Sequence, residues 1–287
     1  MIEAFCPGHI SCIFQPSKGA SIADTGSRGV GIRLGLGARA AVSEVDGDKI
    51  SISIDGIESE APVTRAVAGI LAPGKGFDIS VRNGLPVSQG FGMSAAGAIA
   101  AAVCIAEIAG KSREEAYMAA HEADIRGGGG MGDVAAIASG YSYPVRKIPG
   151  MPAEGKVSGA GMDLGKISVG VVGPKMVTGS VLSDPDRSAA IIAAAESAME
   201  GFLADPSQAN LFRFSNEFSS GTGLESREMS EAMGCLRSMG FAAGMCMLGN
   251  SLFATAPPRV LRRILGPGAF VASCRPYSGE IAIVRRE

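Results

Sequence analysis

The sequence predicts an α+β chain folded into two lobes. Strand and helix patterns are mixed along it without the regular alternation of a doubly wound sheet. Its 287 residues suffice for one large or two medium domains, and the composition shifts around residues 149–160. We therefore expect an N-terminal lobe of residues 1–155 and a C-terminal lobe of residues 156–287.

The first strands are predicted from alternation of apolar residues. In AAVSEVDGDKISISIDG, the residues Ile50, Ile52 and Ile54 share one face, and Asp-Gly turns lie on either side. The stretch GFDISVRNGLP predicts another strand, which ends in an Asn-Gly turn.

Two helices follow, each with a local end signal. Residues 94–109 predict a helix stopped by Gly110. Ser112 and Glu115 form a capping box for a second helix over 113–126, which the glycine run 127–130 ends.

The second half of the chain predicts further helices and strands. We expect a strand over 167–173, helices near 186–204, 207–218 and 225–239, and strands over 245–255 and 280–285.

Charge and composition argue against several classes of partner. The net charge of −2 is spread without a basic stripe, which argues against nucleic acid. No signal peptide is recognised, and the longest apolar segment, 95–109, contains Glu107 and is too short for a bilayer. We thus expect no membrane partner, while exposed apolar surface would allow a homodimer.

The six cysteines are scattered, with no C-x-x-C pair, which indicates reduced thiols in a cytoplasmic protein. Only His9 and His121 could complete a zinc site with them, which argues against one.

The stretch PVSQGFGMSAA, residues 86–96, is the strongest functional signal. Gly90 and Gly92 would let backbone amides approach a phosphate chain, and the following helix N-terminus adds partial positive charge. Ser94 stands where the helix begins and could cap it or bind a metal held by the phosphates. The simpler interpretation is a strand–turn–helix connection. The stretch is neither a Walker A loop nor a dinucleotide fingerprint, because the required spacings are absent.

These residues resemble the second signature of the GHMP small-molecule kinases. CPGHIS (6–11) resembles the first signature of that superfamily, and GMCMLGNSLFA (244–254) resembles the third. The stretches GSRGVGIRL (26–34) and GMGDVAA (130–136) are most similar to archaeal pantoate kinases. In the chain, Met93 replaces the first serine of the usual pair, and His9 stands where a lysine is common, which leaves the role of His9 open.

The resemblance implies a fold, two ligands and a reaction. The N-terminal lobe would contain a left-handed β-α-β unit, and the C-terminal lobe would be ferredoxin-like. ATP and Mg²⁺ would serve phosphorylation of the primary hydroxyl of pantoate to 4-phosphopantoate, for coenzyme A synthesis. Asp133 would activate that hydroxyl. The residues expected to bind the nucleotide are Pro86, Ser88, Gln89, Gly90, Phe91, Gly92, Met93, Ser94 and Ala95.

The magnesium carboxylate has two candidates besides the Ser94 hydroxyl. Family spacing points to Glu122, but at about 100° per residue Asp124 and Glu122 lie on different sides of the helix. Glu122 is also placed to pair with Arg126 at i,i+4. We favour Asp124 and keep Glu122 in reserve. His121 shares the face of Asp124 and is either a substrate ligand or a packed core histidine.

A carboxylate substrate also needs a cation. Arg28 and Arg146 are the candidates, because a guanidinium binds a carboxylate through two hydrogen bonds, although each alone could be a surface charge. Gly249 and Ser251, in the third signature, are further candidates near the phosphates, and His9 is another site candidate.

Two alternatives stay open. The chain could be another GHMP kinase, acting on an isoprenoid intermediate, homoserine or shikimate. It could also be a non-catalytic nucleotide-binding sensor, although the presence of both Ser94 and Asp133 argues against that.

Overall fold

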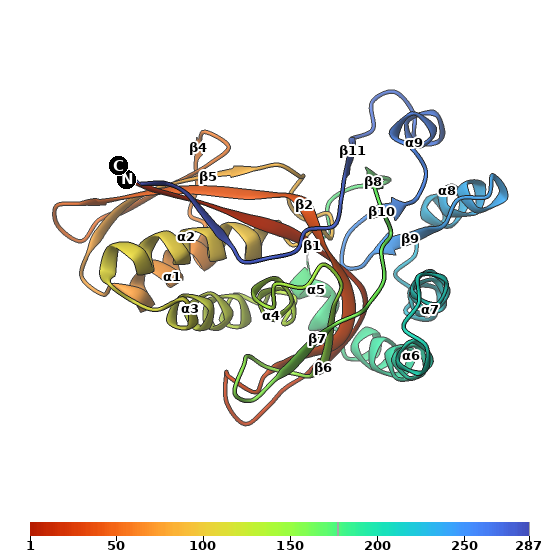
Figure 1. Cartoon of the computed structure of the whole chain (residues 1–287), viewed down its shortest axis with the longest axis horizontal. Helices are drawn as coiled ribbons and strands as arrows, with labels where there is room; N and C mark the ends of the chain where they lie inside the picture. The colour runs from red at the N-terminus through yellow and green to blue at the C-terminus, as the bar shows by residue number, and fades with distance from the viewer. Residues whose placement is uncertain (177, 287) are drawn as a thin grey trace.

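The computed structural model describes residues 1–176 and 178–286, which form two β-sheets with helices packed around them (Figure 1). The large sheet contains β1 (Ile2–Ser17), β2 (Gly26–Val45), β3 (Ile50–Ile54), β4 (Ile57–Glu58), β5 (Gly76–Asn83), β6 (Pro144–Ile148), β7 (Lys156–Gly159) and β12 (Ala282–Arg286). The small sheet contains β8 (Ile167–Val171), β9 (Ala243–Cys246), β10 (Ser251–Ala254) and β11 (Val271–Cys274). The helices are α1 (Pro62–Leu71), α2 (Met93–Ala109), α3 (Arg113–Arg126), α4 (Asp133–Ala138), α5 (Thr178–Leu182), α6 (Pro185–Ala204), α7 (Gln208–Gly221), α8 (Arg227–Ser238) and α9 (Pro258–Leu265).

The α+β prediction is confirmed. The main path of the large sheet runs β12-β1-β2-β5-β3-β4, and β3 and β5, which flank α1 in the chain, pair in parallel. β6 pairs with β2 and with β7. The small sheet runs β11-β8-β10-β9 with antiparallel pairing throughout.

The long antiparallel pair β1–β2 carries residues of the candidate site, including Ser11 of β1. It extends from Ile2 opposite Val42 to Ser17 opposite Gly26. Because successive side chains of a strand point to opposite faces, one face of this pair packs against α2 and α4. β12 pairs with β1, so the two ends of the chain lie together in Figure 1.

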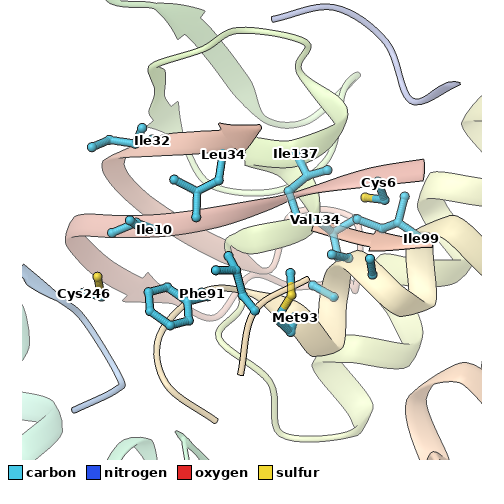
Figure 2. Close-up of a cluster of buried hydrophobic side chains, with 14 of the residues drawn as sticks. Cys6, Ile10, Ile32, Leu34, Phe91, Met93, Ile99, Val134, Ile137 and Cys246 are labelled. Atoms are coloured by element: carbon cyan, nitrogen blue, oxygen red, sulfur yellow. The ribbon is translucent and has the colours of Figure 1, made fainter. Parts of the chain in front are cut away.

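Helix α2 has mostly small side chains and is packed between strands and helices on several sides. Its residues Ala95–Ala106 are all buried, and the helix contacts β1, β2, α1 and α3. Alanine side chains allow these close approaches while burying apolar surface. Gly110 ends the helix with φ 68°, as predicted. Figure 2 shows the cluster at its first turn, where Phe91 and Met93 meet Val134 of α4.

Helix α3 has the predicted bounds and the predicted cap. The Ser112 hydroxyl accepts from the Glu115 amide, and the Glu115 carboxylate accepts from the Ser112 amide. Its predicted packing stripe is buried, namely Ala116, Ala119, Ala120 and Ala123. This helix places Asp124 in its last turn.

The predicted strand over 245–255 is wrong. The segment is a hairpin, in which β9 and β10 are joined by a turn with Leu248 at φ 60°. The first half of the turn is buried and apolar, with Met247 2% and Leu248 9% exposed, and Gly249-Asn250 in its second half is the turn signal that the prediction passed over. Helices α1 and α9 and strand β11 were also not predicted.

The predicted boundary at 155/156 stays a prediction. β7 follows it directly and still pairs with β6, and the C-terminal β12 returns to the large sheet. All six cysteines are free, and only Cys235 is exposed. In the described residues, no helix combines the length and the apolar character that crossing a bilayer requires.

Candidate active site

A loop of residues 86–92, here called the glycine loop, leads from β5 into α2. Three of its residues are left-handed: Ser88 at φ 61°, Gly90 at φ 75° and Gly92 at φ 65°. A Cβ at Gly90 would lie 2.6 Å from the carbonyl oxygen of Cys246, and one at Gly92 would lie 3.1 Å from that of His9. Glycine is required at both positions by backbone conformation and by space.

The glycine loop turns its carbonyls toward the protein. The Ser88 carbonyl accepts from the Met176 amide at 3.0 Å, and the Phe91 carbonyl accepts from the His9 amide at 3.0 Å. Among the described residues, the backbone amides of 89–95 have no backbone carbonyl as acceptor. The loop thus presents a run of unpaired donors at a helix N-terminus, which is the arrangement that binds phosphate.

These donors border a cavity of about 780 Å³. Its polar end is lined by the glycine loop, Ser11, Asp124, Asp133 and residues 127–130. Its apolar wall comes from Ile54 of β3, Ile57 of β4, Pro62 and Val63 of α1, and Val87 of the glycine loop.

Asp133 is the first residue of α4 and is held by His9 of β1. His9 Nδ1 lies 2.7 Å from Asp133 Oδ1, and the carboxylate remains 23% exposed whereas the imidazole is fully buried. Burial lowers the pKa of His9 below its ordinary value, despite the hydrogen bond with Asp133. The ring is therefore neutral at pH 7 and donates its Nδ1 proton to the carboxylate, which fixes one oxygen and leaves the other available.

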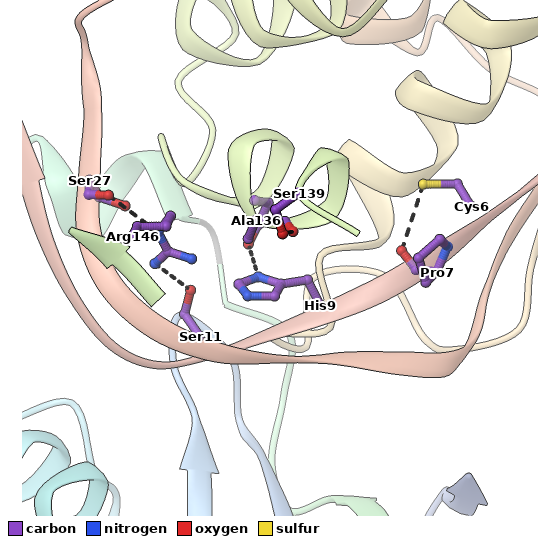
Figure 3. Close-up of polar contacts among 9 residues, drawn as sticks. Cys6, Pro7, His9, Ser11, Ser27, Ala136, Ser139 and Arg146 are labelled. Atoms are coloured by element: carbon purple, nitrogen blue, oxygen red, sulfur yellow. Dashed lines mark hydrogen bonds and ion pairs between the residues drawn. The ribbon is translucent and has the colours of Figure 1, made fainter. Parts of the chain in front are cut away.

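Arg146 of β6 is 1% exposed and lies near His9 (Figure 3), within range of the Asp133 charge. Its Nε donates to the Ser27 carbonyl at 3.2 Å and its Nη2 to the Ser11 hydroxyl at 3.4 Å. Burial lowers its pKa to about 10, while the Asp133 carboxylate acts in the opposite direction. The side chain does not line the cavity, but its partners Ser11 and Asp133 do.

Three buried polar atoms near this guanidinium have no partner among the described residues: His9 Nε2, Ser27 Oγ and Arg146 Nη1. A Cβ on Gly132 would overlap the Ser27 hydroxyl and lie 2.9 Å from Arg146 Nε, so glycine makes room for both. Buried polar groups are normally paired, and orphaned ones in a site indicate a missing ligand.

Asp124 lines the same cavity as Asp133. It is 4% exposed, and burial together with the Asp133 charge raises its pKa to about 7. Its carboxylate lies against the α-carbon of Gly129, where any side chain would overlap it. Two carboxylates held this close favour a cation between them or a proton on one.

The residues present fit a magnesium ion held jointly with a phosphate chain. No cluster of three or more histidine, cysteine or acidic side chains that could hold a metal occurs in the described residues. Mg²⁺ in nucleotide sites needs only one or two protein oxygens, because phosphates and waters supply the rest. Asp124 and the exposed hydroxyl of Ser94 both line the cavity and would supply them.

Replacing Asp124 by asparagine is expected to stabilise the ligand-free protein at pH 8 more than at pH 5. Folding raises this pKa from 3.8 to about 7, so the folded protein retains a proton that the unfolded chain loses. The contribution of Asp124 to the free energy of unfolding is therefore full below about pH 4 and is lost as the pH rises through 7, with an upper bound of about 4 kcal/mol. Thermal unfolding of both proteins without Mg²⁺ measures it. A difference in melting temperature that does not change with pH would contradict this assignment.

Several predicted residues are not brought to the cavity. Glu122 pairs with Arg126 at 2.8 Å and does not line it. His121 is 1% exposed, and its Nε2 lies 3.0 Å from the carbonyls of both Ile22 and Thr25, so it holds the β1–β2 connection. Arg28 and Ser27 project from opposite faces of β2, and the Arg28 guanidinium donates a hydrogen bond to the Gln15 side chain at 3.2 Å.

Gly249 and Ser251 of the third signature contact the backbone of the glycine loop at Gln89 and Gly90. Ser251 is fully buried and its hydroxyl donates to the Gln89 carbonyl. Gly249 packs against the backbone of Gln89 and Gly90. Neither Gln89 nor Pro86 lines the cavity, whereas the other predicted loop residues do.

Sequence reasoning missed Ser11, Ser27 and the apolar wall. Ser27 and Arg28 are neighbours in β2 and therefore point to opposite faces of the sheet. The register of β2 against β6, with Gly29 opposite Arg146, places Ser27 on the face of Arg146. Helix α1 did carry a signal, namely Pro62 in its first turn and buried residues at Thr64, Val67, Ala68 and Leu71.

Comparisons with known proteins show which family the chain resembles. Residues 61–141 match the GHMP kinases N terminal domain. The chain is 32% identical over 265 residues to the pantoate kinase of Thermococcus kodakarensis, covering 88% of this chain and 87% of that one. It is 28% identical over 262 residues to the pantoate kinase of Methanospirillum hungatei, covering 88% and 86%. A solved structure described as a phosphotransferase related to the CoA biosynthesis pathway superposes with a TM-score of 0.88 at 27% identity, over 99% of this chain and 98% of that one.

The fold and the site define a GHMP kinase, an enzyme that transfers a phosphoryl group. Within that class, the extent of the match shows that the chain belongs to the pantoate kinase family.

Proposed function

We propose that this enzyme transfers the γ-phosphoryl group of ATP to the primary hydroxyl of pantoate, giving 4-phosphopantoate for coenzyme A synthesis. The observation that carries the proposal is the placement of Asp133, oriented by His9 at 2.7 Å, beside the buried guanidinium of Arg146 and in the lining of the same cavity as the glycine loop. The similarity to pantoate kinases supports the choice of substrate.

The cavity suits a nucleoside triphosphate. The unpaired amides of residues 89–95 would bind its phosphates, and the apolar wall formed by Ile54, Pro62 and Val87 would cover a purine. Asp124 and Ser94 would hold Mg²⁺, which would neutralise charge on the transferred group.

Asp133 would receive the hydroxyl proton as the pantoate oxygen bonds to the γ-phosphorus and the bond from that phosphorus to the ADP oxygen breaks. The His9 hydrogen bond to Oδ1 leaves Oδ2 facing the substrate. Arg146 and the Ser27 hydroxyl, which lack partners for Nη1 and Oγ, would bind the pantoate carboxylate.

A substrate panel tests the proposal. Purified protein is incubated with Mg-ATP and pantoate, mevalonate, homoserine or shikimate, and phosphorylated product is measured. We expect kcat/KM for pantoate to exceed that for every other alcohol by at least about 100-fold, since a site built for polar groups discriminates strongly against analogues that leave them unpaired. Preference for another alcohol would reject pantoate as substrate, and no transfer to any would favour a nucleotide sensor.

A further inference from the structure

Gln89 lies within the glycine loop, yet its side chain faces away from the cavity. It is 4% exposed and is absent from the cavity lining, whereas its neighbours Ser88 and Gly90 both line the cavity. A buried amide in a loop needs partners for its donor and its acceptor.

The nitrogen and the oxygen of the Gln89 side chain each form a hydrogen bond with a segment next to the small sheet. Its Nε2 donates to the Gly173 carbonyl at 3.1 Å, just after β8. Its Oε1 accepts from the Asn250 amide at 3.1 Å, in the turn between β9 and β10. The backbone carbonyl of Gln89 also accepts from the Ser251 hydroxyl. One residue of the glycine loop is therefore tied to two segments that lie more than 80 residues away in the chain.

The two tied segments are also bonded to each other. The Asn250 carbonyl accepts from the amides of Val172 and Gly173, and the Asn250 side chain donates to the Pro174 carbonyl at 2.7 Å. The anchor for Gln89 is thus a hydrogen-bonded unit and not a single flexible contact.

These bonds determine which way the loop peptides face. With the Ser88, Gln89 and Phe91 carbonyls all turned into the protein, the amides of the loop remain directed to the cavity. We propose that Gln89 is a positioning residue, which holds the glycine loop in its phosphate-binding conformation by tying it to the β9–β10 turn and the segment after β8. This inference rests on the proposed function only in requiring that the loop bind nucleotide phosphates.

Glutamine suits this role for a chemical reason. The glutamine amide carries its donor and its acceptor on two separate atoms, which reach the Gly173 carbonyl and the Asn250 amide, and asparagine is one methylene shorter. Methionine has similar length but makes neither bond, while glutamate keeps the acceptor and places a carboxylate against a carbonyl oxygen. Gln89→Met and Gln89→Glu therefore remove the bonds in different ways at nearly constant volume.

The test is calorimetric titration of the full chain with a non-hydrolysable ATP analogue plus Mg²⁺, and separately with adenosine. For Gln89→Met and Gln89→Glu we expect Kd for the ATP analogue to rise about tenfold, as loss of buried hydrogen bonds would give. Adenosine affinity should stay within about twofold, because adenosine has no phosphates for the loop.

Asn216→Leu is the matched control. Its side-chain amide joins the carbonyls of Phe212 and Ala243 at the far end of β9, away from the glycine loop. We expect this variant to lower the melting temperature and leave both Kd values unchanged.

Unchanged affinity for the ATP analogue in both Gln89 variants would overturn the inference, as would an equal loss for adenosine. A wild-type protein that binds no nucleotide would refute both this inference and the proposed function. A wild-type protein that binds nucleotide but phosphorylates another alcohol would refute only the substrate, and the comparison of Gln89 variants would stand.

Discussion

Asp133→Asn is expected to lower kcat for pantoate phosphorylation by about 10²- to 10⁴-fold, the usual contribution of a general base. Asparagine keeps the shape of the side chain and still accepts the His9 Nδ1 proton, so the fold and the orientation of the group are retained. What is lost is a negative group able to take the hydroxyl proton. Steady-state kinetics measures this directly, and KM for ATP should change little because Asp133 is not one of the loop residues whose amides are proposed to bind the phosphates.

Glu122→Gln is the control for this experiment. It neutralises a carboxylate on α3 that pairs with Arg126 outside the cavity, so we expect wild-type kinetics. An Asp133→Asn enzyme that keeps more than about a tenth of wild-type kcat would show that proton removal by this carboxylate is not central.

Arg146→Met is expected to raise KM for pantoate by about 10- to 100-fold, because a hydrogen bond to a charged group contributes roughly 1.5–3 kcal/mol. Among the described residues the Nη1 nitrogen of this buried guanidinium has no partner, and the guanidinium lies close enough to Asp133 for the two charges to interact. KM for ATP should stay near its wild-type value, since the glycine loop is formed by other residues. Thermal unfolding of the variant checks that the loss does not come from a damaged fold.

Arg28→Met is the matched control on the neighbouring strand. Arg28 projects from the opposite face of β2 and bonds to Gln15, so its loss should leave KM for pantoate unchanged. Equal effects of the two substitutions would mean that the guanidinium acts through general charge and not through a bound carboxylate.

The sequence alone allowed prediction of elements whose signals are local. Helix α3 has its predicted bounds because its capping box and the terminal glycine run act within one turn. The preference for Asp124 over Glu122 came from helix geometry, and the structure places Asp124 in the cavity and Glu122 outside it.

Features that depend on strand register could not be predicted. Arg146 lies beside Ser27 and the Asp133–His9 pair, and Arg28 does not, because Gly29 of β2 pairs with Arg146 of β6, two residues more than a hundred positions apart in the chain. The β9–β10 hairpin was missed although Gly249-Asn250 marks its turn, because the buried apolar Met247 and Leu248 continue the strand pattern into the turn. The role of Gln89 depends on contacts to Gly173 and Asn250 that no local pattern reveals.

The most direct measurement is a crystal structure with pantoate and a non-hydrolysable ATP analogue. We predict the triphosphate within hydrogen-bond distance of the amides of residues 90–94, the primary hydroxyl of pantoate on the free oxygen of Asp133, and its carboxylate on Arg146. Triphosphate bound away from the glycine loop, or a pantoate hydroxyl out of reach of Asp133, would contradict it.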